Sequence, residues 1–275
     1  MNSTLHPFPE LIAEICTDLG INLTRLSRNW VYQLEKDGKI RHIISNRFDL
    51  NPQAAGLLMD DKYACYSVLK SQNIPTIEHY LIFNPGRLPT YVPAGGVWPE
   101  VKAIFERHQR LVAKPNHGNR GRGIYLCDTY PELERAITTL FRTHPTISLC
   151  PFYDVPHEYR VFFLDGVVKL IYGKTRTEGE WKHNLTHGAQ AFLLDDPHNP
   201  HHADLRRRLA DLAQRSAHAT NLRFATIDVS ELTTGELLIM EINSGVAMGK
   251  FIEQIPSGRR LAKSIYTAAI QAMFP

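Results

Sequence analysis

Two apolar segments near the end of the chain decide its fold: Phe224-Ala-Thr-Ile-Asp228-Val-Ser230 and Leu237-Leu-Ile-Met-Glu241-Ile-Asn243-Ser-Gly245. Both contain β-branched residues, and the residues that join them include Thr233, Thr234 and Gly235, so the pattern predicts a β-hairpin. A two-residue turn at Thr234 and Gly235 would place Asp228 directly opposite Glu241.

The polar residues of this hairpin indicate a metal site. Side chains alternate along a strand, so Glu241 and Asn243 share a face. Asp228 joins them there, and two carboxylates with an amide suit a hard divalent cation such as Mg²⁺. An ordinary hairpin with polar residues on its solvent face explains the same pattern, and the hairpin alone leaves both interpretations open.

Composition places the chain among globular enzymes. Its 275 residues suit one or two compact domains, and the hydrophobic fraction of 43% is ordinary. A net charge of +3 fits anionic small-molecule substrates and is too weak to indicate nucleic acid. The four cysteines are scattered, as in a reduced protein. With no signal-peptide pattern and no apolar stretch of membrane-spanning length, the expected class is a cytoplasmic enzyme without a membrane partner.

The remaining periodicity predicts alternating helices and strands. We expect helices over 7–19, 60–71, 101–108 and 131–142, and a further one whose apolar stripe includes Leu205, Leu209 and Leu212. Strands are expected over 30–34, 40–44, 79–83, 111–114 and 123–127, with a hairpin over 161–172 and an irregular loop over 84–99. This alternation favours an α+β or α/β enzyme with more than one lobe.

A second group of chemically informative residues follows the strand that ends at Lys114. Three glycines, Gly118, Gly121 and Gly123, come within nine residues of that lysine, and another strand follows them. Glycine-rich backbone can approach phosphates closely, and a lysine adds a point charge. A Rossmann loop would need a helix here, and a P-loop would need Gly-Lys-Ser/Thr. A purely structural glycine-rich hairpin remains the alternative.

The order of these features along the chain is more specific than any one of them. Lys62 begins a helix and Lys114 precedes the glycine-rich segment; Cys150-Pro-Phe-Tyr153, His157-Glu158-Tyr-Arg160, Lys182-His-Asn184 and the Asp228/Glu241/Asn243 set follow. This order resembles the ATP-grasp superfamily of carboxylate–amine ligases, in particular its glutathione-synthetase and ribosomal-protein glutamate-ligase branch. The likeness runs from Asn51 to Phe251, and Met240-Glu-Ile-Asn-Ser-Gly245 is similar to the metal-binding motif of that branch.

The resemblance implies an α+β ATP-grasp fold in which two β-rich lobes clasp ATP. Lys62 and Lys114 would bind phosphates, and Asn116 to Gly123, with Gly118, Gly121 and Gly123, would form the flexible loop that closes over them. The hinge lining adenine would consist of Cys150, Pro151, Phe152 and Tyr153, with backbone groups reading the purine edge. Cys150 and Pro151 depart from the amide and acidic residues usual there. Glu158 would hold the ribose hydroxyls.

Other positions are expected to carry the chemistry. Lys182 and Asn184 correspond to an Arg-x-Asn pair that touches phosphates and metal, although lysine lacks the bidentate fork of arginine. Asp228, Glu241 and Asn243 would bind two Mg²⁺ ions, for which Mn²⁺ can substitute. Arg160, Lys174 and Arg176 are candidates to hold the substrate carboxylate and its acyl phosphate, against the alternative of a generic basic surface. His183 or His187 could assist proton removal, although polar loop histidines are the simpler interpretation.

The predicted organisation has three parts: residues 1–59 as a shortened N-terminal α/β domain, 60–149 as the small lobe and 150–275 as the large lobe. A short N-terminal part leaves an open cleft, which favours a peptide or bulky acceptor, or a homodimer or partner protein that completes the acceptor site. We therefore expect an amide-forming ligase with small-molecule or peptide carboxylate and amine substrates, in specialised peptide or natural-product biosynthesis. An ATP-grasp cyclo-ligase or kinase, or a nucleotide-binding module without ligase activity, is the alternative.

Overall fold

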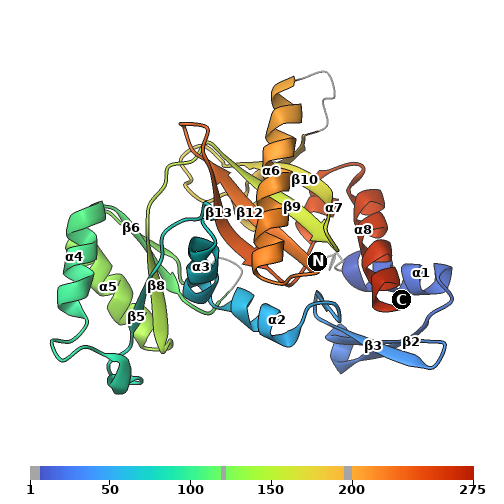
Figure 1. The fold of residues 1–275 in the computed structure, drawn as a ribbon, viewed down its shortest axis with the longest axis horizontal. Helices are drawn as coiled ribbons and strands as arrows, with labels where there is room; N and C mark the ends of the chain where they lie inside the picture. The colour runs from blue at the N-terminus through green and yellow to red at the C-terminus, as the bar shows by residue number, and fades with distance from the viewer. Residues whose placement is uncertain (1–6, 119–121, 195–199) are drawn as a thin grey trace, which may run out of the picture.

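The computed structural model of the protein describes residues 7–118, 122–194 and 200–275. Figure 1 shows three regions along the longest axis: a small lobe at one end, a central sheet, and an N-terminal sheet at the other end. Within the described ranges, no helix is both long enough and apolar enough to cross a bilayer.

The central region is a five-stranded antiparallel sheet in the order β11-β10-β9-β12-β13. Its strands are β9 (His157–Leu164), β10 (Val167–Thr175), β11 (Gln190–Leu193), β12 (Phe224–Glu231) and β13 (Leu237–Asn243). Helix α6 (Pro200–Ala219) covers one face, and its buried stripe of Leu205, Leu209 and Leu212 packs with Val161 and Ile227. The apolar stripe predicted from sequence is confirmed.

The small lobe is a four-stranded antiparallel sheet in the order β5-β8-β6-β7. It comprises β5 (Tyr80–Phe83), β6 (Leu111–Pro115), β7 (Tyr125–Cys127) and β8 (Thr146–Pro151), with helices α4 (Trp98–His108) and α5 (Tyr130–Phe141) packed in the same core. Helix α5 begins where Thr129 and Glu132 form a reciprocal capping box, which satisfies amide groups that the first helical turn leaves unpaired.

The N-terminal region combines α1 (Pro7–Asp18) with an antiparallel meander of β1 (Asn22–Leu26), β2 (Val31–Lys36), β3 (Lys39–Ile44) and β4 (Arg47–Phe48). Helices α7 (Gly249–Gln254) and α8 (Gly258–Met273), from the other end of the chain, belong to the same region. Phe8, Phe48, Phe162, Phe224 and Tyr266 share one core. The N-terminal segment is thus built onto the central sheet.

Two consecutive helices link the regions. Helix α2 (Gln53–Asp60) is followed at once by α3 (Lys62–Ser71), and Asp61 lies between them. The Asp61 side chain accepts a hydrogen bond from the Ala64 amide at 2.8 Å, so it caps α3 and fixes Lys62 at the first helical position. Short 3₁₀ turns occupy Ser27–Asn29, Pro89–Tyr91 and Leu185–His187.

The β12–β13 hairpin has the predicted pairing but reaches it by a different route. Asp228 does pair with Glu241, yet the connection is a three-residue loop, since the Leu232 amide bonds the Glu236 carbonyl at 2.8 Å. Gly235 has φ of 80° in that loop, as a three-residue hairpin requires. The predicted two-residue turn is therefore wrong. A bulge at Met240 shifts the register by one residue and restores the Asp228–Glu241 pair.

Candidate active site at the charged end of the central sheet

One face of the central sheet changes from apolar to charged along its strands. Phe162, Tyr172 and Phe224 are buried in the core with α8 at one end of this face. Toward the other end, strand pairing places Asp228 opposite Arg160, and Lys174 opposite Glu158. Paired residues of antiparallel strands project to the same side, so four charges from three strands converge.

Asp228 is the centre of this charged group. Its carboxylate accepts hydrogen bonds from Arg160 Nε at 2.8 Å and from Arg160 Nη2 at 2.6 Å. Lys174 Nζ donates to Asp228 Oδ1 at 2.9 Å and also to Glu158 Oε1. Two cations and two carboxylates therefore balance in a largely buried position.

The pKa values follow from this balance. Burial alone would raise the pKa of Asp228, but Arg160 and Lys174 outweigh it and hold that pKa well below its usual range. Burial raises the pKa of Glu158 against the attraction of Lys174. Burial opposes the charge of Lys174, yet Asp228 and Glu158 raise its pKa. Asp228 and Lys174 are thus ionised at neutral pH.

The remaining predicted metal ligands lie beside Asp228. Asn243 Nδ2 lies 3.5 Å from Asp228 Oδ2, and Glu241 is the cross-strand partner of Asp228. Two carboxylates and an amide fit a hard cation, and the exchange of amide oxygen and nitrogen in Asn243 would add an oxygen ligand. Among the described residues, no three His, Cys, Asp or Glu side chains group to hold a metal ion, and the predicted set contains two.

The two predicted phosphate lysines lie on either side of the glycine-rich segment. Lys62 Nζ donates to the Gly118 carbonyl at 2.7 Å and lies 3.7 Å from Glu241 Oε1. Burial lowers the pKa of Lys62, and Lys114 adds to this effect while Glu241 opposes it. Lys114 is buried on β6 opposite Ser148 and has no ion pair within the described part of the chain. Both cations are thus available to an anionic ligand.

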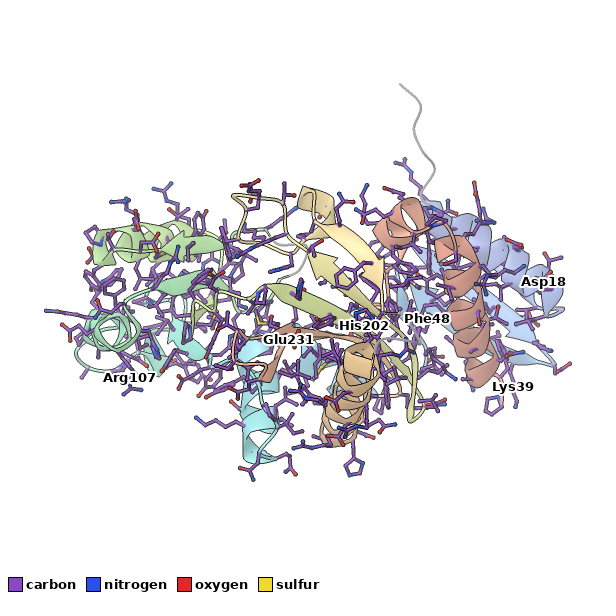
Figure 2. All side chains as sticks on the ribbon, turned by 90° about the horizontal axis from the view of Figure 1, so that it is seen from above. Asp18, Lys39, Phe48, Arg107, His202 and Glu231 are labelled. Carbon is purple, nitrogen blue, oxygen red and sulfur yellow. The ribbon has the colours of Figure 1, made fainter. Side chains whose placement is uncertain are left out.

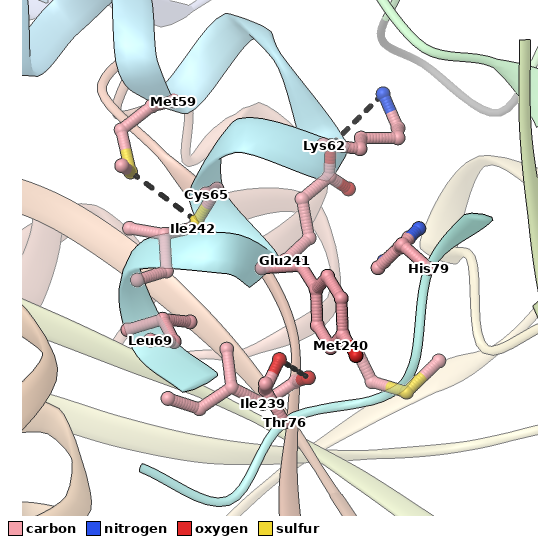
Figure 3. Close-up of a pocket in the computed structure, with 11 residues that line it drawn as sticks. Met59, Lys62, Cys65, Leu69, Thr76, His79, Ile239, Met240, Glu241 and Ile242 are labelled. Carbon is pink, nitrogen blue, oxygen red and sulfur yellow. Dashed lines mark hydrogen bonds and ion pairs between the residues drawn. The ribbon is translucent and has the colours of Figure 1, made fainter. Parts of the chain in front are cut away.

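Figure 3 shows the pocket that borders this group, with Lys62 and Glu241 joined by a dashed line. Its lining also includes Met240, Cys65 and His79. The pocket therefore connects α3 with β13 directly beside a predicted metal ligand.

An apolar cluster between the two sheets adjoins these charges. Val112 and Cys150 come from the small lobe, and Leu238 comes from β13; Phe152, Tyr153, Met240 and Trp181 pack against them. Such a slot suits an aromatic base. The sequence indicated Cys150 to Tyr153 but missed Val112, Leu238, Met240 and Trp181. The uninterrupted apolar run Leu237–Met240 was the available signal, because it requires cover on both faces of β13.

The hinge offers fewer backbone donors than predicted. The Phe152 amide already donates to the Arg110 carbonyl at 3.0 Å, and Pro151 has no amide hydrogen. The Arg110 guanidinium lies 4.2 Å from the Phe152 ring centroid, which holds that ring in place. Burial raises the pKa of the Cys150 thiol, so this cysteine is a packing residue.

The structure separates three predicted residues from the group around Asp228. Arg176 pairs with Asp154 at 2.7 Å, and Lys182 lies 5.0 Å from the Trp181 ring centroid. The Asn184 side chain accepts from the Thr186 amide at 2.9 Å. Their contacts are local to the loop regions after β8 and β10, so their roles stay predictions.

The predicted glycines differ in what the structure describes. Gly123 has φ of 65°, where other residues are strained, and a Cβ there would lie 3.3 Å from Leu140 Cδ2. Gly118 supplies the carbonyl that Lys62 contacts. Gly121 lies outside the described residues.

Comparison with known proteins places this arrangement in a family. Residues 82–263 match the model of an ATP-grasp domain, the third family of its clade. A probable alpha-L-glutamate ligase of Shewanella halifaxensis is 26% identical over 136 residues, which are 49% of this chain and 28% of that protein. The chain thus matches little more than a quarter of the length of this curated relative.

Solved structures show the same fold. The D-alanine–D-alanine ligase of Bacillus anthracis has a TM-score of 0.60 at 16% identity, over 81% of this chain and 68% of that one. The ATP-grasp ligase PsnB, in complex with its precursor peptide PsnA2 and AMPPNP, has a TM-score of 0.53 at 14% identity, over 80% and 61%. The predicted α+β ATP-grasp fold is confirmed, and the chain belongs to this ATP-grasp domain family.

Proposed function

We propose that this protein is an ATP- and Mg²⁺-dependent ligase that forms an amide bond through an acyl phosphate. The observation that carries the proposal is the convergence of Asp228, Glu241 and Asn243 with the cations Lys62, Arg160 and Lys174, directly beside an apolar slot between two sheets. The membership in the ATP-grasp family and the match to a probable glutamate ligase support it.

The proposed reaction has two steps. A substrate carboxylate oxygen attacks the γ-phosphorus of ATP, the bond to the β-phosphate oxygen breaks, and ADP leaves. An amine nitrogen then attacks the acyl carbon, the carbon–oxygen bond to phosphate breaks, and the amine releases a proton. Neither step needs a covalent enzyme nucleophile, so catalysis depends on positioning and charge stabilisation.

The residues of the site divide this work. Lys62 and Lys114 would bind the phosphates, and the apolar slot around Cys150 and Leu238 would hold adenine. Arg160 and Lys174 would stabilise the carboxylate and the acyl phosphate. When bound by Asp228, Glu241 and Asn243, Mg²⁺ supplies Lewis-acid neutralisation of phosphate charge. The ribose contact of Glu158 stays a prediction, because that carboxylate is bonded to Lys174 here.

A peptide or natural-product substrate in the cytoplasm is the biological setting that we propose. All four cysteines are free thiols, as in reducing compartments. PsnB, one of the proteins of similar fold, was solved with a precursor peptide.

A phosphate-release screen tests the proposal. The protein would be incubated with ATP, Mg²⁺ and paired amino acids or dipeptides, and positive pairs would be analysed by mass spectrometry. We expect phosphate release that requires both substrates, and a product lighter than their sum by one water. Release that needs one substrate and yields a phosphorylated product would indicate a kinase, and a dehydrated single substrate a cyclo-ligase. ATP binding without turnover across the screen would favour a nucleotide-binding module.

A further inference from the structure

The outer face of the N-terminal sheet carries an apolar row whose purpose the fold does not explain. Strand pairing aligns Leu26 with Val31, Val31 with Ile44, and Ile44 with Arg47. Paired residues share a face, and the opposite face of the sheet is the one buried in the core through Tyr32 and Ile43. Leu26 is 42% exposed and Ile44 is 48% exposed. We call Leu26, Val31 and Ile44 the apolar row.

The apolar row lies at the end of the sheet that borders the candidate active site. The turn after Ile44 contacts the segment after β13, because the Asn46 carbonyl accepts from the Val246 amide at 2.8 Å. A Cβ on Gly245 would lie 2.8 Å from the Asn46 side-chain oxygen, so the two segments approach closely there. Val246 is three residues beyond the predicted metal ligand Asn243.

A second connection leads from the row to the phosphate lysine. Arg47 continues the row and forms a bidentate ion pair with Asp60, the last residue of α2. Lys62, which contacts Gly118 and Glu241, follows two residues later. Leu57 lies one turn before Asp60 on α2 and is 61% exposed. Apolar surface therefore extends to both sides of this ion pair.

The shape of the row favours a peptide chain over a single amino acid. It crosses three strands, and strand spacing near 4.8 Å gives it a width of roughly 10 Å, about three residues of extended chain. Trp30, which is 54% exposed, follows the β1–β2 connection at the same end, and its carbonyl accepts from the Ser45 amide at 2.7 Å. Because Asp60 neutralises Arg47, the charge of that arginine does not oppose an apolar segment that passes from the row toward Lys62.

We propose that the apolar row, with Trp30 beside it, binds an apolar peptide segment of the substrate and directs its reacting end toward Lys62 and Asn243. This inference rests on the proposed ligase function and adds the substrate class. The row would contribute to peptide affinity and leave ATP binding unchanged.

The sheet supplies a matched control. Ile40 lies on the same strand and the same face as Ile44 and is equally exposed, at 48%. It pairs with Glu35 at the opposite end of the sheet, beside Lys39, which Figure 2 shows at the far end of the molecule from Arg107. Ile44→Ser and Ile40→Ser therefore change the same surface chemistry at opposite ends.

The test is a fluorescence-anisotropy measurement on the full chain with AMPPNP and Mg²⁺ present. The probes are fluorescein-labelled Gly-Leu-Leu-Leu-Gly and Gly-Ser-Ser-Ser-Gly. We expect the leucine peptide to bind at least about tenfold more tightly than the serine peptide, the range for burying a large apolar side chain. Ile44→Ser should remove most of that preference, and Ile40→Ser should leave it within about twofold. Leu26→Ser provides a second variant on the row if Ile44→Ser does not fold.

Each other outcome overturns the inference. A leucine peptide that binds no better than the serine peptide, or equal losses from both isoleucine variants, would contradict it. Sedimentation that shows a dimer in the wild type and in Ile40→Ser, but a monomer in Ile44→Ser with unchanged peptide binding, would make the row an interface between copies. The phosphate-release screen fails or succeeds separately, since peptide binding requires no turnover.

Discussion

At the scale of single residues, the site is defined by how its charges are shared. Asp228 has both carboxylate oxygens bonded to Arg160 and one also bonded to Lys174, whereas Glu241 has Lys62 at 3.7 Å as its partner among the described residues. Truncating one partner of a buried pair leaves an uncompensated charge and costs stability. Glu241 is therefore the carboxylate whose function can be tested with the least effect on folding.

Glu241→Gln is near-isosteric and should retain the fold while it removes charge needed to hold Mg²⁺. ATP-dependent turnover should fall by at least about a hundredfold, as for loss of a major electrostatic stabiliser. Steady-state phosphate release measures this loss, and Glu236→Gln, at an exposed position of the same hairpin, is the control. Turnover like that of the wild type in Glu241→Gln would refute the metal assignment.

Lys114→Ala tests phosphate binding. The lysine is buried beside the nucleotide slot without an ion pair in the described residues, so its loss should weaken ATP binding and leave adenosine binding nearly unchanged. Calorimetry with ATP, ADP and adenosine separates these effects, and Lys102→Ala, on the exposed face of α4, controls for loss of surface charge. Equal weakening for all three ligands would assign Lys114 a structural role.

At the scale of elements, local pattern predicted most of the secondary structure. The helix at Pro7–Asp18, the Asp165–Gly166 turn and the Asp228–Glu241 pair were all indicated by spacing or turn residues. The pair was obtained although the loop is one residue longer, since the bulge at Met240 compensates. Strands β1, β4 and β11 and helices α2, α7 and α8 were not predicted, because short or polar elements are stabilised by neighbours distant in sequence.

Contacts between distant elements account for what could not be predicted of the site. The pairing of Arg160 with Asp228 depends on β9 lying beside β12, strands that are far apart in sequence. Trp181 reaches the slot through its edge-to-face contact with Phe152 at 6.0 Å, which no spacing rule anticipates. The family resemblance supplied the residues, and the sheet order supplies their geometry.

The junction of β5 and β8 predicts a pH dependence of stability. His79 is buried and its Nδ1 lies 2.6 Å from Ser148 Oγ; burial, with Lys114 and Lys62, lowers its pKa well below 6.5. Burial likewise lowers the pKa of His183 to about 4. The unfolded chain takes up protons below pH 6.5 and the folded chain does not. The stability contributed by these groups is therefore complete above that pH and is lost as pH falls.

Urea unfolding between pH 7.5 and 4.5 measures this loss. We expect the free energy of unfolding to fall with pH, and His79→Gln to reduce the slope by up to about 1.4 kcal/mol per pH unit below pH 6. His42→Gln, at an exposed position, should leave the slope unchanged. An unchanged slope in His79→Gln would contradict the neutral buried state of His79.

At the scale of the whole molecule, the two ends of the chain join in one region. Glu14 of α1 pairs with Arg259 at 2.7 Å and with Lys263 at 2.6 Å, both on α8, and the core beneath them includes Phe162 and Phe224 of the central sheet. The apolar row is therefore held by the same core that supports Asp228. This arrangement places the proposed peptide surface, the charged group and the nucleotide slot along one molecule.

The central claim is that a carboxylate is activated by phosphorylation and then joined to an amine. Oxygen tracing tests it most directly: the carboxylate found in the phosphate-release screen would be labelled with ¹⁸O at both oxygens, and the product and the released phosphate would be analysed by mass spectrometry. The account predicts one labelled oxygen in the phosphate and one in the amide for each turnover. Amide product with both labels retained, or label recovered in AMP, would contradict it.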